Sequence, residues 1–147
     1  GAVGAGGCCG GQAADLAADP GSVELDDLEG IHARKTGALF VAAVRGGALA
    51  GGAGEAALEA LTLYGRNLGL AFQITDDLLD LEGDPAVLGK DVHRDAHRAN
   101  FATVLGVESC RALVAELIDT ALAALAPFRR RSAVLADVAR FVRERRK

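Results

Sequence analysis

The sequence predicts an all-α fold, and its composition and patterning both support this. Half of its 147 residues are hydrophobic, but only 4% are aromatic and none is Trp. The core must therefore be built from Ala, Leu and Val, which suit close-packed helices. Apolar residues recur at helical spacing, and no segment shows the apolar-polar alternation of a half-buried strand. We expect one helical domain without a sheet.

The first half of the chain is predicted to hold short helices separated by glycine-rich segments. Residues 1–11 are rich in glycine but lack a correctly spaced G-x-G-x-x-G, and no strand precedes them, so a dinucleotide site is not expected. Residues 12–18 have the pattern of a short helix or of the end of one, and 19–22 that of a turn. A helix over about 24–45 precedes a glycine-rich break at 46–54.

The longest predicted helix covers residues 55–82. Its expected buried side consists of Leu58, Leu61, Leu68, Phe72, Thr75 and Leu79. Its expected polar side consists of Glu59, Thr62, Arg66, Gln73, Asp77 and Asp80. A loop over 82–98 should follow, and then two helices at about 108–126 and 132–145, separated by Pro127 and three arginines.

Composition also restricts the class and the location of the protein. No run approaches the roughly 18 apolar residues of a membrane span, and the first residues do not form a signal peptide. The three cysteines fit neither a disulfide framework nor a zinc site. We expect a cytoplasmic protein without stable membrane insertion and without a nucleic-acid partner. Because the sequence begins with Gly1 and contains no methionine, we expect it to be a piece of a longer protein.

Three carboxylates gather near the C-terminal end of the long predicted helix. Asp76, Asp77 and Asp80 share a helix face with Gln73, and a glycine and a proline should end the helix just beyond them. A helix C-terminus carries partial negative charge, so each acid there is disfavoured by roughly 0.3–1 kcal/mol, and the acids repel one another. A bound cation would remove both penalties.

The donor atoms favour one kind of cation. A calcium loop beginning at Asp80 is excluded because its glycine is misplaced and Asp91 stands where a glutamate is needed. Mg²⁺ fits better, since this hard ion takes a few carboxylate oxygens and keeps its other positions for water and phosphates. By themselves, the three acids are compatible with a Mg²⁺ site or with a solvated helix face.

Several cationic residues could contact an anion. Lys35 presents a compact charge suited to phosphate, and the adjacent Thr36 adds a hydroxyl. Lys90 follows a glycine, and residues 129–147 contain eight bases against two acids. Each lysine taken alone is also explained by a surface position, and the basic end by a solvated last helix. His32 alone is explained by a satisfied core or surface position.

Four segments together resemble the trans-isoprenyl diphosphate synthases, in the same order and at similar spacing. They are residues 10–16 (GGQAADL), 31–40 (IHARKTGALF), 64–80 (YGRNLGLAFQITDDLLD) and 83–90 (GDPAVLGK). The resemblance is greatest to the bacterial farnesyl and geranylgeranyl diphosphate synthases, and it covers the C-terminal half of such proteins.

The resemblance implies a fold and a reaction. The expected fold is the C-terminal half of an isoprenoid-synthase-type helical bundle around a central apolar cavity, with residues 1–147 forming a single partial domain. The expected reaction is the condensation of isopentenyl diphosphate with an allylic diphosphate, with farnesyl diphosphate as the product. The full-length protein is expected to be a homodimer.

The resemblance also assigns roles to residues. Asp76, Asp77 and Asp80 match the second of two aspartate-rich motifs that bind Mg²⁺, and the first motif is absent. The expected catalytic residues are Lys35, Thr36 and Gln73, and the expected substrate-binding residues are Lys35, Lys90, Arg145 and Arg146.

With half of the metal site missing, we expect the isolated chain to be inactive. The alternative is a non-catalytic, synthase-like subunit that binds a full-length prenyl synthase.

Overall fold

The computed structural model describes residues 1–19, 22–82 and 100–145. Every regular element in this described part is a helix, which confirms the all-α prediction. In chain order the elements are α1 (Cys8–Ala17), α2 (Leu25–His32), the π-helical turn η1 (Ala33–Gly37), α3 (Ala38–Ala50), α4 (Glu55–Glu82), α6 (Phe101–Leu105), α7 (Val107–Ala124), the 3₁₀ turn η2 (Ala126–Ser132) and α8 (Ala133–Glu144).

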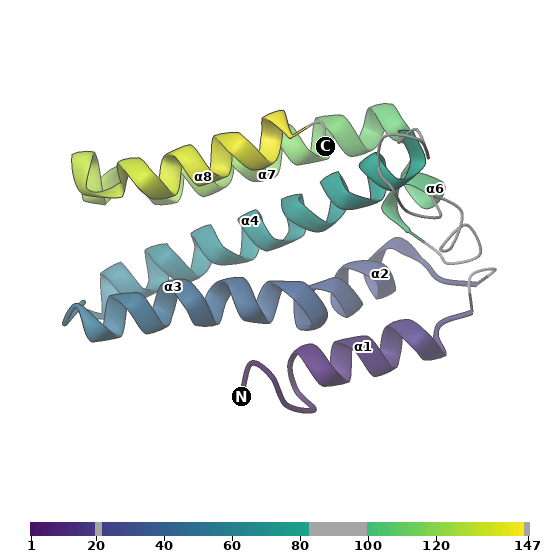
Figure 1. Ribbon diagram of the computed structural model, residues 1–147, viewed down its shortest axis with the longest axis horizontal. Helices are drawn as coiled ribbons and strands as arrows, with labels where there is room; N and C mark the ends of the chain where they lie inside the picture. The colour runs from purple at the N-terminus through teal and green to yellow at the C-terminus, as the bar shows by residue number, and fades with distance from the viewer. Residues whose placement is uncertain (20–21, 83–99, 146–147) are drawn as a thin grey trace.

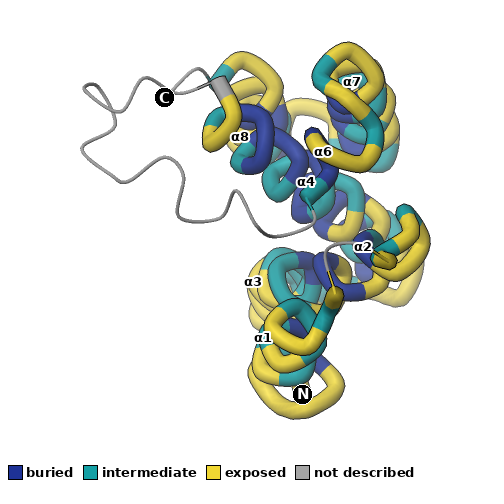
Figure 2. The backbone as a smooth tube through the Cα atoms, turned by 90° about the vertical axis from the view of Figure 1, so that its right-hand side faces the viewer, coloured by how far each residue is buried: buried dark blue, intermediate teal, exposed yellow. Residues whose placement is uncertain are grey.

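Helix α4 lies in the middle of the arrangement. Figure 1 shows α7 and α8 along one side of α4, with α3 along the other and α1 beyond α3. The packing of α4 against α7 and α3 provides the two largest contacts between elements of the described part. Buried residues accordingly gather along α4 and on the inner sides of α7 and α8 (Figure 2). One long helix thus connects the two sides of the molecule.

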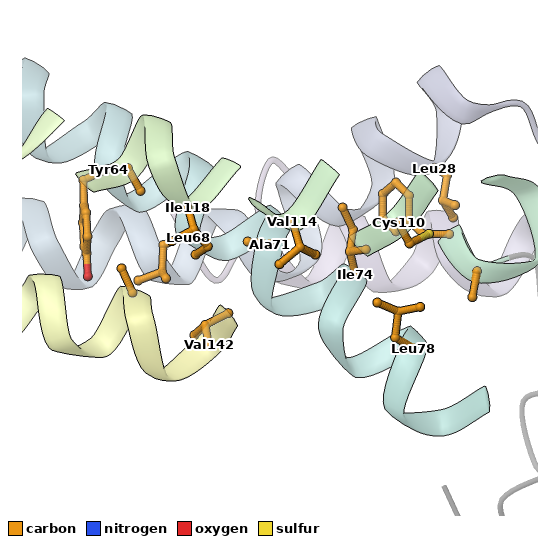
Figure 3. Close-up of a cluster of buried hydrophobic side chains, with 14 of the residues drawn as sticks. Leu28, Tyr64, Leu68, Ala71, Ile74, Leu78, Cys110, Val114, Ile118 and Val142 are labelled. Atoms are coloured by element: carbon orange, nitrogen blue, oxygen red, sulfur yellow. The ribbon is translucent and has the colours of Figure 1, made fainter. Parts of the chain in front are cut away.

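The main apolar core surrounds α4 and includes residues from α7 and α8. Leu68 and Ile74 of α4 belong to the same cluster as Val114 and Ile118 of α7 (Figure 3). The buried Tyr64 hydroxyl donates a hydrogen bond of 2.8 Å to the carbonyl oxygen of Leu135 in α8. A buried hydroxyl needs such a partner, so this bond ties α8 to α4.

The other side of α4 approaches its neighbours through glycines. A Cβ atom on Gly69 would lie 3.0 Å from Cα of Gly37, and one on Gly65 would lie 3.1 Å from Cα of Val41. The backbones of α3 and α4 can therefore come closer than larger side chains would allow. Gly37 directly follows Thr36 in η1, and Gly69 lies four positions before Gln73 on α4.

The helix boundaries largely agree with the sequence prediction. Helix α4 has the predicted limits of 55 and 82, and α7 and α8 each begin and end within two residues of theirs. Helix α3, however, continues to Ala50 instead of breaking at Gly46. Nothing lies within 4 Å of a Cβ atom built on Gly46 or Gly47, and the apolar Ala48 and Val44 pack against the core, which holds this turn in place.

Helix α1 also begins at Cys8 rather than at the predicted residue 12, and further features differ from the prediction. The five-residue helix α6 was not predicted; it begins with a capping box, in which the Asn100 side chain accepts from the backbone N–H of Thr103. Asp77 was placed on the polar side of α4, but it is buried, with only 7% of its surface exposed. Most of the predicted 82–98 loop lies outside the described residues. No helix of the described part is long and apolar enough to cross a membrane.

Candidate active site

The π-helical turn η1 determines the directions of Lys35 and Thr36. Helix α2 continues through η1 into α3, and a π turn adds a residue to one helical turn, a feature frequent at functional sites. Lys35 makes its ion pair with α1, whereas Thr36 makes its hydrogen bond with α4. Two adjacent predicted site residues therefore contact different helices.

Lys35 is held by α1. Its Nζ lies 2.8 Å from Oδ2 of Asp15, and the side chains are 26% and 10% exposed. Gly11, one turn before Asp15, permits this contact, because a Cβ atom there would lie 2.3 Å from the Lys35 backbone nitrogen. An ammonium has three N–H donors, so Lys35 can contact an anion while keeping Asp15. Gly11 and Asp15 belong to the segment 10–16 that carries the resemblance, but residue spacing alone does not pair Asp15 with Lys35, which is 20 positions away.

Thr36 and Gln73 are connected directly. The Thr36 hydroxyl donates to Oε1 of Gln73 at 3.1 Å. The amide nitrogen of Gln73 then donates to Oδ1 of Asp77 at 2.9 Å. Both ends of the Gln73 amide are therefore fixed, and two of the predicted catalytic residues form one hydrogen-bonded unit.

Asp77 extends this unit to α6. Its second oxygen, Oδ2, accepts from the backbone N–H of Phe101 at 2.9 Å. Burial raises the pKa of Asp77 to about 6; the hydrogen bonds from Phe101 and Gln73 act in the opposite direction, and the neighbouring Asp80 and Asp76 raise it further. The polar-face prediction for Asp77 is wrong because helical periodicity does not show that α6 covers this part of α4.

Asp76 is more accessible than Asp77. Its side chain is 33% exposed, and its Oδ1 accepts from Nη1 of Arg145 at 2.5 Å. The Arg145 guanidinium also lies 5.2 Å from the ring centroid of Phe72, within cation–π range. Asp80 is exposed. Arg145 thus places positive charge beside the acidic motif, as the electrostatics of the helix end favour.

His32 is buried next to Phe101, the residue that donates to Asp77. It is 5% exposed, and its ring centroid is 5.4 Å from that of Phe101. Burial lowers the pKa of His32 to about 4, an effect that Asp15 and Gln73 oppose and Lys35 reinforces. Its Nδ1 has no hydrogen-bond partner among the described residues. His32 is therefore a neutral core residue at pH 7.

The described residues do not form a complete metal site. Among them, no group of three or more His, Cys, Asp or Glu side chains is arranged to hold an ion. Asp76 and Asp80 nevertheless offer the carboxylate oxygens that Mg²⁺ prefers, and this ion needs only one or two protein carboxylates when phosphates supply other ligands. The donor set fits Mg²⁺. Lys90 and Arg146 lie outside the described residues.

A family model described as polyprenyl synthetase matches residues 4–126. The chain belongs to the polyprenyl synthetase family. It is 50% identical over 123 residues to the farnesyl diphosphate synthase of Escherichia coli (strain K12), a match that covers 82% of this chain and 41% of that protein. The chain thus spans about two fifths of the length of this curated relative.

Solved polyprenyl synthetase structures share the fold. A polyprenyl synthase from Caulobacter crescentus, complexed with calcium and isoprenyl diphosphate, superposes with a TM-score of 0.87 at 27% identity, covering 95% of this chain and 56% of that one. A geranyltransferase from Helicobacter pylori, complexed with magnesium and isoprenyl diphosphate, gives a TM-score of 0.77 at 26% identity, covering 95% and 48%. This agreement confirms the helical fold expected from the sequence.

Proposed function

We propose that this chain forms one side of the active site of a Mg²⁺-dependent short-chain prenyltransferase. The reaction would condense isopentenyl diphosphate with an allylic diphosphate and yield farnesyl diphosphate. The observation that carries the proposal is the Thr36–Gln73 hydrogen bond, which joins two predicted catalytic residues 37 positions apart. Similarity to farnesyl diphosphate synthases supports it.

Positive charge at one end of the site suits a diphosphate leaving group. Lys35, with Lys90, is proposed to hold the allylic diphosphate, because an ammonium stabilises the negative charge that grows as the carbon–oxygen bond breaks. The resemblance assigns Asp76, Asp77 and Asp80 to Mg²⁺, and the more accessible Asp76 and Asp80 are the proposed ligands in this chain. When bound, Mg²⁺ would neutralise the departing diphosphate.

Oxygen dipoles at the other end suit a carbocation. Thr36 donates its only hydroxyl proton to Gln73, so the Thr36 oxygen has lone pairs left to face positive charge. The orientation is preorganised, since Asp77 holds the same Gln73 amide from its other end. The double bond of isopentenyl diphosphate would attack the cation, and the loss of a proton would complete the condensation.

The remaining predictions belong to the same proposal. Arg145 and Arg146 would contact isopentenyl diphosphate, and Arg145 would then exchange its partner Asp76 for the substrate. The homodimer is proposed for the full-length protein, with a location in the cytoplasm. These proposals follow from the family resemblance of the sequence.

Calorimetric titration with inorganic pyrophosphate, with and without Mg²⁺, tests the site in this chain. We expect pyrophosphate binding that depends on Mg²⁺ and weakens about 10-fold or more in Asp76→Asn, the order expected when a ligand or its close support is removed. Glu59→Gln is the matched control, because it removes an exposed carboxylate elsewhere on α4. Equal binding by both variants would contradict the proposed site.

A condensation assay with radiolabelled isopentenyl diphosphate tests the second part of the proposal. We expect no turnover by the chain alone, since it contains one of the two aspartate-rich motifs. Turnover by the isolated chain would refute this expectation. Co-purification with a full-length synthase that stays active when this chain carries Asp76→Ala would instead favour the non-catalytic subunit.

A further inference from the structure

Two neighbouring acids on α4 have different surroundings. The side chain of Asp76 is 33% exposed, and its Oδ1 accepts a hydrogen bond from the long side chain of Arg145. Asp77 is 7% exposed as a residue, and each of its oxygens accepts a hydrogen bond from the protein. A Mg²⁺ ion that keeps water and phosphate in its coordination shell needs open space around the carboxylate oxygen. Asp76 offers such space, whereas Asp77 is enclosed.

The two partners of Asp77 lie in different parts of the chain. Gln73 is one turn earlier on α4, and Phe101 is the first residue of α6, 24 positions later. The Phe101 side chain is fully buried and contacts His32, so the position of Phe101 also affects the end of α2. A single carboxylate therefore holds α4, the start of α6 and the Gln73 amide in one arrangement.

Asp77 also decides the direction of the Gln73 amide. An ionised carboxylate only accepts hydrogen bonds, so it selects the NH₂ end of Gln73. The carbonyl end of Gln73 must then face Thr36, whose hydroxyl becomes the donor. If residue 77 were equally able to donate, the amide could turn over and the Thr36 hydroxyl proton could point elsewhere.

We propose that Asp77 is a positioning residue and not a Mg²⁺ ligand: it orients Gln73, and through Gln73 the Thr36 hydroxyl, while anchoring the start of α6. This inference rests on the proposed function, since it assigns Gln73 and Thr36 to the carbocation end of the site. It divides the acidic motif into an open carboxylate at Asp76 and a buried structural carboxylate at Asp77.

Asp77→Asn and Asp76→Asn, compared in the full chain, test the inference. Asparagine keeps the shape of aspartate, but its NH₂ group cannot accept, so one of the two bonds to residue 77 must be lost. Three quantities are measured: hydrogen exchange of the Phe101 amide, the NMR signals of the Gln73 side-chain NH₂, and calorimetric binding of inorganic pyrophosphate with Mg²⁺.

We expect opposite results from the two variants. Asp77→Asn should shift the Gln73 NH₂ signals or speed exchange at Phe101 by about 10-fold, the order expected for losing a hydrogen bond to a charged group. Its Mg²⁺-dependent binding should change by no more than about two-fold, with normal Mg²⁺ stoichiometry. Asp76→Asn should weaken binding by about 10-fold and leave both spectroscopic signals unchanged. A shift of the Gln73 signals separates positioning from a loss of stability alone.

The inference is overturned if Asp77→Asn weakens Mg²⁺-dependent binding as strongly as Asp76→Asn does. It is also overturned if Asp77→Asn leaves both the Gln73 and the Phe101 signals unchanged. If the unaltered chain binds no pyrophosphate with Mg²⁺, the proposed function fails in this chain. In that case the two NMR measurements still decide whether Asp77 positions Gln73 and Phe101.

Discussion

Helix α4 contacts α7 on one side and η1 with α3 on another, and the two contacts are built from different residues. Toward α7 it contributes large apolar side chains such as Leu68 and Ile74 to the main core (Figure 3). Toward η1 and α3 it contributes Gly69, Gln73 and, one turn further, Asp77, which ties Gln73 to α6. The first contact buries apolar surface, whereas the second combines close backbone approach with buried polar groups.

The difference separates the residues of α4 that stabilise the fold from those that belong to the proposed site. A glycine within a helix costs about 1 kcal/mol relative to alanine, and burying a carboxylate costs more unless hydrogen bonds compensate it. Both features occur on the side of α4 that carries the predicted site residues. The apolar contact with α7 offsets these costs, so the same helix can support an energetically unfavourable site.

The largest expected effect concerns the apolar contact. Ile118→Ala removes a fully buried side chain from α7, so we expect the free energy of unfolding to fall by about 2–5 kcal/mol, measured by urea denaturation. Val134→Ala on α8 is the control, because that side chain is 75% exposed and its loss should change stability by less than about 0.5 kcal/mol. A loss below about 1 kcal/mol for Ile118→Ala would mean that this contact is not the main source of stability.

The sequence predicted the limits of α4 better than its buried side: Leu58, Leu61 and Leu68 are buried as expected, but Phe72 and Leu79 are only partly buried. Helical spacing predicted α4 between its observed limits, since 28 residues give a clear period. The same spacing could not show that Asp77 is buried, because that depends on α6, whose five residues are too few to display a period. The resemblance brought Thr36 and Gln73 into one site, but Asp15 and Gly11 emerge only when α1 is seen against η1.

The second prediction concerns how the free energy of unfolding changes with pH. This change depends on two buried ionisable residues on the polar side of the α4 contacts, His32 and Asp77. In the unfolded chain His32 gains a proton near pH 6.5, but in the folded chain only near pH 4, so acidification through this range lowers stability. Asp77 acts in the opposite sense: it loses its proton near pH 3.8 when unfolded and near pH 6 when folded, so stability falls as pH rises between these values. At about 1.4 kcal/mol per pKa unit, each effect amounts to about 3 kcal/mol.

Metal-free protein and two variants separate these effects. Between about pH 4 and 6 the free energy of unfolding of the unaltered chain should depend only weakly on pH, because the two groups have opposite effects. Asp77→Asn should lose stability steeply on acidification, since His32 then acts alone. His32→Gln should gain stability on acidification, since Asp77 then acts alone. All other groups are common to the three proteins, so differences in their urea midpoints isolate this pair. Parallel pH profiles would show that neither pKa is shifted by folding.

The smallest expected effect tests the close approach of α3 and α4. A Cβ atom in Gly69→Ala would lie 3.0 Å from Cα of Gly37, and this backbone atom can move only if the two helices separate. We expect a net loss of about 1–2 kcal/mol, because overpacking exceeds the gain in helix propensity. In Gly47→Ala the new methyl group meets nothing within 4 Å, so this control should be stabilised by about 0.5–1 kcal/mol. Equal stability changes in the two variants would show that α3 can move away from α4 freely, in which case the Thr36–Gln73 bond would not depend on this contact.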